Sequence, residues 1–493
     1  MQTLPAIDIA VLAVYLVAVV GLGVWFARAN RSSKDFMAAG GSLPGWAVGL
    51  SIFGTYLSSN TFIGVPGKAY AGNWNGFVFS LSLPLAAWVA VKWFVPFYRK
   101  SGEISAYHHL EKRFGPWART YALVCYLLTQ LARVGTILFG VSLGLSALTG
   151  WSLPGVIIVS GFAVTAYTLL GGIVAVIWTD VIQSIVLLIG AVVIAVLLLM
   201  NHPEGAGEAM QVAAAADKFS LGSFSIDFTQ STFWVVLIYG IFINLNNFGI
   251  DQSFVQRYHT ASDDQAAARS VWIGALLYVP VAALFFFIGS MLFSYYEASP
   301  ALLAELKAAH PEGYADQVLP HFIATQLPIG VAGLLIAAIF AAAMSSIDTS
   351  LNSSATVTLK DFIQRFFRRG ENDKDALRIL RASTLVWGIL GTGVALAMMG
   401  QKSLLDAWWK LSGIFAGGML GLFLLGLIAR TANNAGAVTG VILGVLIISW
   451  MTLADYFPEE FRSPFHANMI IVVGTLTIFL TGIVVSHWRS SKE

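Results

Sequence analysis

Apolar residues occur in long runs along this chain, and short polar segments separate the runs. A run of about 20 apolar residues is long enough to cross a bilayer as a helix. The runs lie at 6–27, 45–66, 74–97, 119–148, 154–176, 180–200, 232–250, 269–294, 328–351, 380–400, 407–428, 435–455 and 466–486. We therefore predict an all-helical integral membrane protein with about thirteen spans, formed by residues 1–493 as a single transmembrane domain.

The composition agrees with this prediction, and the distribution of charges predicts how the chain is oriented in the membrane. Of the 493 residues, 57% are hydrophobic and only 11% are charged, whereas soluble domains carry about 25% charged residues. Most lysines and arginines fall on one side of the predicted membrane, in segments such as 360–381, while the long loops 201–230 and 295–327 are acidic. By the positive-inside rule, the N-terminus lies outside and the C-terminus in the cytoplasm. The net charge of +2 indicates no nucleic-acid partner.

Two of the predicted spans have polar residues at their centre. The span 45–66 contains the run Thr55–Thr61. Near its end the span 232–250 contains Asn244, Asn246, Asn247 and Gly249, which precede Asp251. Such runs are typical of helices that unwind midway and expose carbonyl oxygens to a cavity. We expect both helices to be broken.

The two broken spans occupy corresponding positions in two predicted five-helix units, 45–200 and 232–428. Because each unit has five spans, the second must be inverted in the membrane relative to the first. The segment 6–27 is then an extra N-terminal helix that is retained, and 435–486 forms two C-terminal helices. This arrangement is typical of transporters that work by alternating access, with the binding site at the midplane.

The span 328–351 turns from apolar to hydroxyl-rich at membrane depth. Ala342, Ser345, Ser346 and Thr349 share one helical face. Hydroxyl oxygens on such a face suit a desolvated monovalent cation, but they also occur where Ser and Thr bond back to carbonyls in a packing seam. Asp348 lies at the flank of this face, and a carboxylate at this depth favours a functional site.

Two further charged residues need partners within the membrane. Arg133 lies about fifteen residues into its span, so it pairs either with Asp348 or Asp180, or with a substrate carboxylate through a bidentate contact. Asp180 either caps a helix with Thr179 or stands beside the hydroxyls of 328–351, where a second cation binds.

The sequence lacks the residues that several classes of protein require. The histidines all lie outside the centres of the predicted spans, which argues against a membrane-embedded metalloprotease or acyltransferase. No Walker A motif is present, so ATP does not drive the protein directly. We therefore expect no enzymatic activity.

Three segments together resemble the sodium:solute symporter family: Gly171–Gln183, Asp251–Tyr258 and Ala341–Ser353. The resemblance covers nearly the whole chain. It implies a LeuT-type fold and a secondary active symporter that imports a small organic solute with one or two sodium ions (Na+). It also implies a multi-pass protein of the bacterial inner (plasma) membrane, with the lipid bilayer around it and no obligatory protein partner.

The same resemblance implies two sodium sites. The first consists of Gly54, Leu57, Ala342, Ser345 and Ser346, and the second of Asp180, Ser345, Asp348 and Thr349. In the second site Asp348 stands where the sialic-acid branch has a serine. The two carboxylates either bind the ion more tightly, or Asp348 is protonated or paired with a cationic side chain.

The nearest branch resembles the bacterial sialic-acid symporters. Its ligand positions match at Ser58, Thr61 and Arg133, whereas Tyr56 replaces a threonine and Ser80 a glutamine. The predicted substrate-binding residues are Tyr56, Ser58, Asn60, Thr61, Ser80, Arg133 and Asn247. A carboxylated solute, with sialic acid as the leading candidate, is therefore expected; the alternatives are a sodium/sugar or sodium/monocarboxylate symporter and, more remotely, a passive channel or facilitator.

Overall fold

The computed structural model describes residues 5–27, 32–58, 60–311, 313–399 and 404–490. Its helices, with short 3-10 or π segments labelled η, are α1 (Ala6–Ala27), α2 (Ser33–Ala38), η1 (Ala39–Gly41), α3 (Gly45–Tyr56), η2 (Asn60–Gly64), α4 (Val65–Ala71), η3 (Trp74–Phe77), α5 (Val78–Leu81), α6 (Leu83–Val89), η4 (Ala90–Phe94), α7 (Val95–Ser101), α8 (His108–Phe114), α9 (Pro116–Thr149), α10 (Leu153–Met200), α11 (Ala206–Ala215), α12 (Phe233–Ile250), α13 (Gln252–Thr260), α14 (Asp264–Glu297), α15 (Pro300–Ala309), η5 (Tyr314–Gln317), α16 (Val318–Gln326), α17 (Val331–Val357), η6 (Thr358–Phe367), α18 (Asp373–Ala397), α19 (Leu404–Ile428), α20 (Asn434–Thr452), η7 (Ala454–Tyr456), η8 (Glu459–Phe461) and α21 (Met469–Ser490).

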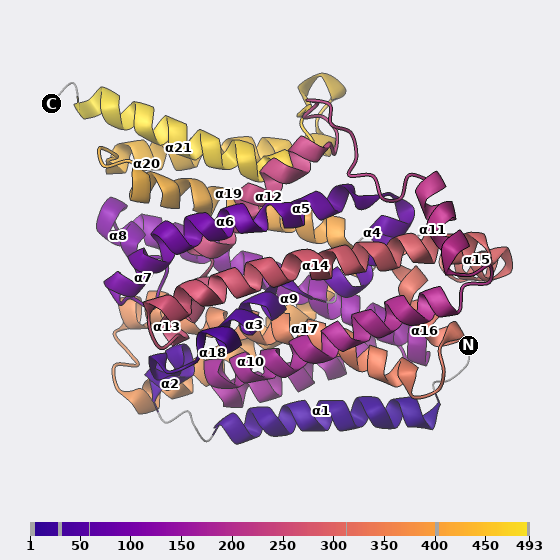
Figure 1. Cartoon of the computed structure of the whole chain (residues 1–493). Coiled ribbons are helices and arrows are strands. Elements are labelled where there is room, and N and C mark those ends of the chain that lie inside the picture. Colours follow the sequence, from indigo (N-terminus) through magenta and orange to yellow (C-terminus); the bar gives the residue numbers. More distant parts are fainter. Residues whose placement is uncertain (1–4, 28–31, 59, 312, 400–403, 491–493) are drawn as a thin grey trace.

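Long helices run side by side across the molecule, as Figure 1 shows. Within the described ranges, ten helical segments are long and apolar enough to cross a membrane. One of them, α10, covers two predicted spans, 154–176 and 180–200, and Gly172 divides it with a φ of 56° and a ψ of −165°. Only glycine adopts such a backbone conformation readily. The all-helical membrane architecture is confirmed, whereas the number of thirteen spans stays a prediction.

The two predicted helix breaks are both present. The helix α3 ends at Tyr56 because Leu57 is extended, with a φ of −92° and a ψ of 114°. The helix α12 ends at Ile250, where Asp251 is extended and caps α13 by accepting a hydrogen bond from the Ser253 backbone N–H at 2.8 Å. In both cases polar residues replace the apolar residues that would have kept the helix continuous.

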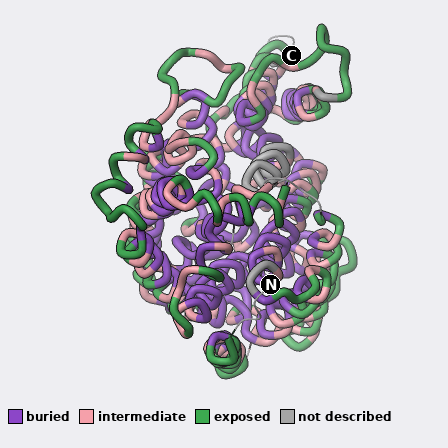
Figure 2. Tube along the Cα trace, turned by 90° about the vertical axis from the view of Figure 1, so that its right-hand side faces the viewer, coloured by how far each residue is buried: buried purple, intermediate pink, exposed green. Residues whose placement is uncertain are grey.

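The core of the bundle forms around α17. In its most apolar stretch 89% of the residues are buried, compared with 17% in α1, which lies along the lower edge of Figure 1. Figure 2 shows the same contrast, with buried residues gathered in the interior and exposed ones around them. The helix α17 is thus screened from lipid by its neighbours, and polar groups on it face other helices.

The outlying helix α1 is fastened to the beginning of α17. Asp8 Oδ1 accepts hydrogen bonds from the backbone N–H groups of Gly330 (2.8 Å) and Gly333 (2.7 Å). The four N–H groups that open a helix have no partner within it, and the helix dipole favours a negative charge there. Asp8 therefore caps α17 from a different part of the chain.

A backbone bridge joins the segments that flank the two broken helices. Leu43, before α3, pairs with Ala261, after α13, through hydrogen bonds from Leu43 N to Thr260 O (2.9 Å) and from Ser262 N to Leu43 O (3.1 Å). Arg99 reinforces this end of the bundle, since it donates to Ala261 O at 2.9 Å and pairs with Asp264 at 2.7 Å. This end is the one predicted to be cytoplasmic.

Candidate functional site

The break in α3 brings the residues of the predicted first sodium site together. The Ser346 hydroxyl of α17 donates to the Leu57 carbonyl oxygen at 3.3 Å. Gly54 lies so close to α17 that a Cβ there would stand 2.7 Å from Ser345 Oγ. Ser345 and Ser346 are 2% and 0% exposed, so both face the interior. An unwound carbonyl and buried hydroxyls thus converge, although the binding of an ion there stays a prediction.

Ala342 completes this set one helical turn before Ser345 and Ser346. It is buried on α17 with 1% of its surface exposed. Gly54, Leu57, Ser345 and Ser346 therefore lie where α3 meets α17, and Ala342 is buried one turn earlier on the same helix.

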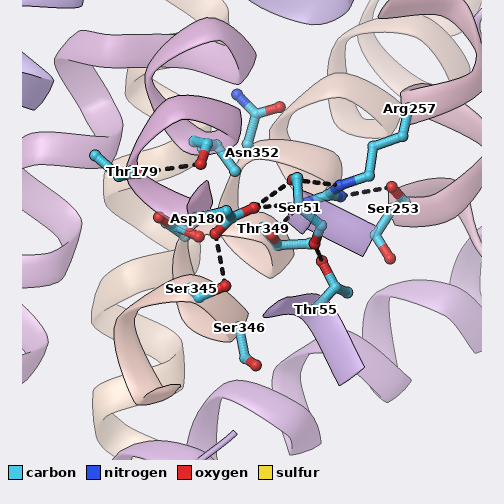
Figure 3. Close-up of polar contacts among 12 residues, drawn as sticks. Ser51, Thr55, Thr179, Asp180, Ser253, Arg257, Ser345, Ser346, Thr349 and Asn352 are labelled. Carbon is cyan, nitrogen blue, oxygen red and sulfur yellow. Dashed lines mark hydrogen bonds and ion pairs between the residues drawn. The ribbon is translucent and has the colours of Figure 1, made fainter. Parts of the chain in front are cut away.

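Next to this meeting point, Asp180 of α10 sits in a dense polar network (Figure 3). Its Oδ1 accepts a hydrogen bond from Ser345 Oγ at 2.6 Å. Its Oδ2 accepts a hydrogen bond from the Ser51 hydroxyl and forms an ion pair with Arg257 Nη2 at 3.0 Å. Both charged side chains are buried. Asp180 therefore already has a cationic partner within the chain.

Each nitrogen of the Arg257 guanidinium donates to a neighbouring residue. Nε donates to Ser51 Oγ at 2.8 Å, Nη1 to the Ser253 carbonyl at 2.7 Å, and Nη2 also to Thr349 Oγ1 at 2.7 Å. Arg257 thus reaches Asp180 and Thr349, two of the residues predicted to hold a second sodium ion. Sequence reasoning included Arg257 in a family segment but gave it no role.

Asp348 of the predicted second site makes a different contact. Its Oδ2 accepts a hydrogen bond from the Tyr167 hydroxyl at 2.6 Å. Among the residues that the structure describes, no side-chain hydrogen bond or ion pair links Asp348 to Asp180, Ser345 or Thr349, although the Asp180 carboxylate lies within its electrostatic reach. Three of the four predicted ligands therefore share one network, and Asp348 belongs to another.

Two alternatives left open by the sequence are wrong. Asp180 does not cap a helix, because α10 continues from Leu153 to Met200 on both sides of it. Within the described ranges Arg133 forms no ion pair with Asp180 or Asp348; its Nη2 donates instead to the Thr55 backbone carbonyl. That carbonyl lies in the last turn of α3, directly before the break. Arg133 is thus anchored at the broken helix.

A cavity lies between the two broken helices. The predicted substrate residues Tyr56, Ser58, Thr61, Ser80, Arg133 and Asn247 all line it. The seventh, Asn60, has a side chain outside the described part of the chain. The sequence prediction therefore brought together residues that do share one cavity, while their role in binding stays a prediction.

Sequence reasoning missed other residues of the same cavity. Asp251, at the break between α12 and α13, lines it, and Gln130 Nε2 donates to Asp251 Oδ2 at 3.2 Å. Aromatic walls come from Tyr239, Phe254, Tyr278 and Phe286. The polar break before Asp251 was the available signal. The cavity thus offers a guanidinium, a carboxylate, hydroxyls, amides and aromatic faces to one solute.

Comparisons with known proteins agree with this geometry. The family model described as "Sodium:solute symporter family" matches residues 36–444. The chain is 36% identical to the sodium/sialic acid symporter NanT of Aliivibrio fischeri, over 97% of this chain and 94% of that protein. It is 35% identical to the sodium/sialic acid symporter SiaT of Proteus mirabilis over the same shares. The sodium-coupled monocarboxylate transporter 2 of Mus musculus is 28% identical, over 93% of this chain and 74% of that protein.

Solved structures extend the agreement to the fold. The substrate-bound, outward-open structure of a Na+-coupled sialic acid symporter superimposes with a TM-score of 0.89 and 33% identity, covering 98% of both chains. The nucleobase-cation symporter Mhp1 superimposes with a TM-score of 0.58 at 16% identity, over 94% of this chain and 96% of that one. These likenesses confirm the LeuT-type fold. The chain belongs to the sodium:solute symporter family.

Proposed function

We propose that this protein imports a carboxylated organic solute, of the sialic-acid class, together with sodium across a bacterial inner membrane by alternating access. The observation that carries the proposal is the place of Arg133. Its guanidinium lines the cavity at the broken end of α3, where the Leu57 carbonyl meets the Ser346 hydroxyl. A bound anion and a bound sodium ion would therefore both order the same few residues.

The rest of the cavity suits a solute with several polar groups. A carboxylate needs the fork of Arg133, while hydroxyl and amide groups of the same solute find Asp251, Asn247 and Ser80 as partners. Apolar surface of the solute packs on the aromatic walls. A small monocarboxylate would use Arg133 but leave most of these groups unpaired, which disfavours it.

Uptake into proteoliposomes tests the proposal directly. With an inward sodium gradient, we expect accumulation of radiolabelled sialic acid above the outside concentration, and no accumulation when choline replaces sodium. Arg133→Ala removes the partner of a buried carboxylate, which costs about 2 kcal/mol or more and weakens binding at least roughly 30-fold. Arg133→Lys keeps the charge without the fork and is expected to fall between the two.

The matched control is Arg378→Gln, because the Arg378 side chain is 81% exposed on α18, away from the cavity. It should transport like the wild type. Accumulation of a pyruvate-sized monocarboxylate, but not of sialic acid, would replace the substrate class. Sodium-independent equilibration without accumulation would replace symport by a passive pathway.

A further inference from the structure

The cavity between the two broken helices contains hydrogen-bond acceptors that lack donors. Gln130 of α9 and Asn246 of α12 both line the cavity, and they are only 1% and 2% exposed. Their amide oxygens, Gln130 Oε1 and Asn246 Oδ1, have no hydrogen-bond partner in the described part of the chain. Buried polar atoms without partners are rare in folded proteins, and each needs an explanation. A ligand in the cavity can supply the missing donors.

Asp251 connects these two side chains and fixes which amide atom of Gln130 is left over. Gln130 Nε2 donates to Asp251 Oδ2 at 3.2 Å. An ionised carboxylate only accepts hydrogen bonds, so the nitrogen of the Gln130 amide must face it and the oxygen must face away. The backbone N–H of Asp251 donates to the Asn246 carbonyl oxygen at 3.0 Å. The three residues therefore form one connected group at the break after α12.

Asp251 has acceptor capacity of its own. It is 4% exposed and lines the same cavity. Its Oδ1 accepts from the backbone N–H and the hydroxyl of Ser253, whereas the described residues give its Oδ2 only the hydrogen bond from Gln130. An ionised carboxylate has about four lone-pair positions, so Oδ2 can accept one more hydrogen bond. The Arg133 guanidinium lies within electrostatic reach of this carboxylate. The cavity thus combines a group that binds an anion with a neighbouring set of acceptors.

We propose that Gln130, Asn246 and Asp251 form a specificity-determining subsite that binds the hydrogen-bond donors of the transported solute. The proposal rests on the function proposed above and extends it. The carboxylate of the solute pairs with Arg133, and its hydroxyl or amide N–H groups donate to Gln130 Oε1, Asn246 Oδ1 and Asp251 Oδ2.

This subsite defines the class of solute more narrowly than a carboxylate alone. It fits an acid that also carries several hydroxyls or an N-acylated amine. An acid without such donors leaves the buried acceptors unpaired, and a site built around a donor strongly rejects an analogue that lacks it. A second carboxylate on the solute would face the Asp251 carboxylate and two further acceptors, so dicarboxylates are rejected as well.

Analogues that each lack one donor test the subsite by their binding. Purified full-length protein in sodium buffer is titrated calorimetrically with sialic acid (N-acetylneuraminic acid), with its 4-, 7-, 8- and 9-deoxy analogues and with the analogue methylated at the amide nitrogen. We expect the wild type to bind at least one analogue roughly 10- to 100-fold more weakly than the parent.

Two variants assign the donors to individual acceptors. Asn246→Leu and Gln130→Met each remove one amide oxygen and keep a side chain of similar size. Each variant should bind the parent about tenfold or more weakly. Each should also bind one analogue as well as the parent, because the acceptor for the missing donor is already gone. The analogue should differ between the two variants. A purely structural role would weaken the parent and all analogues by the same factor.

Asn244→Leu is the matched control. Asn244 lies two positions before Asn246 on α12, and its Oδ1 is likewise buried without a partner among the described residues. Its Nδ2 donates to Ser82 at 2.9 Å, and it is not one of the described residues that line the cavity. This variant should discriminate among the analogues as the wild type does.

Two results would overturn the subsite alone and leave the proposed function in place. One is a wild type that binds every analogue as well as it binds sialic acid. The other is discrimination in Asn246→Leu and Gln130→Met that is unchanged from the wild type. A wild type that does not bind sialic acid in the presence of sodium would overturn the proposed function and the subsite with it.

Discussion

Two buried aspartates beside one helix face show opposite ways of handling a charge. Asp180 holds Arg257 at 3.0 Å and accepts hydrogen bonds from Ser51 and Ser345. Asp348 accepts one hydrogen bond, from Tyr167. The described residues give the first carboxylate a cationic partner, whereas they give the second only a hydroxyl donor. A self-balanced pair supports the fold, whereas an unbalanced group can respond to an ion.

The largest expected effect on the free energy of unfolding comes from removing the Asp180 carboxylate from its ion pair with Arg257. Asp180→Asn leaves the Arg257 guanidinium buried without a carboxylate, which should lower the free energy of unfolding by about 3–5 kcal/mol. Thermal unfolding of the purified protein, with and without sodium, measures this loss. The double variant Asp180→Asn with Arg257→Met should recover most of it, because no uncompensated charge is left. A single variant as stable as the wild type would show that the ion pair does not support the fold.

An aspartate-to-asparagine substitution at Asp348 should stabilise the protein, whereas the same substitution at Asp180 should destabilise it. In sodium-free buffer, Asp348→Asn keeps an acceptor for Tyr167 and removes the unbalanced charge, so the free energy of unfolding should rise by about 1–3 kcal/mol. Adding sodium should stabilise the wild type more than the variant, because both proteins keep the residues of the predicted first sodium site and only the wild type keeps the Asp348 carboxylate of the predicted second site.

The measurement is again thermal unfolding, now as a sodium titration of both proteins. If Asp348→Asn in sodium-free buffer is destabilised as strongly as Asp180→Asn, the contrast between the two carboxylates is wrong. Tyr107→Phe serves as the control, because it changes a buried hydroxyl before α8, away from both aspartates.

The smallest effect is expected at a third carboxylate that contacts α17. Asp8 is balanced by the N-terminus of the helix, through the N–H groups of Gly330 and Gly333. Asp8→Ala should lower the free energy of unfolding by about 1 kcal/mol, the usual loss of a helix cap. Asp8→Asn keeps the acceptor and should recover most of it. A chemical-denaturation series on the three proteins can resolve this order.

Local patterns in the sequence predicted the breaks and the buried hydroxyls. A polar run in an apolar span is typical of a helix that opens, so the breaks within residues 55–61 and before Asp251 were predicted without knowing their neighbours. The spacing of Ser345 and Ser346 likewise fixed a shared helical face. These features depend on residues close together in the chain.

Partners that lie far apart in the chain could not be predicted in the same way. Arg257 follows the second break and is 77 positions away from Asp180 in the sequence, yet folding brings the two side chains to within 3.0 Å. Helical periodicity put Asp348 at the flank of the hydroxyl face, but it could not tell that Tyr167 fills the neighbouring space. Which helix packs on which flank depends on the tertiary arrangement, and periodicity carries no information about it.

The backbone bridge between Leu43 and Ala261 couples the two halves of the chain mechanically. It ties the start of one interrupted helix to the end of the other through the hydrogen bonds of Leu43 N and Leu43 O. A movement that swings α3 outward at this end must take α13 with it or break both bonds. The segments at Leu43 and Ala261 should therefore move as one unit. A solute released at this end would pass both segments in the same movement.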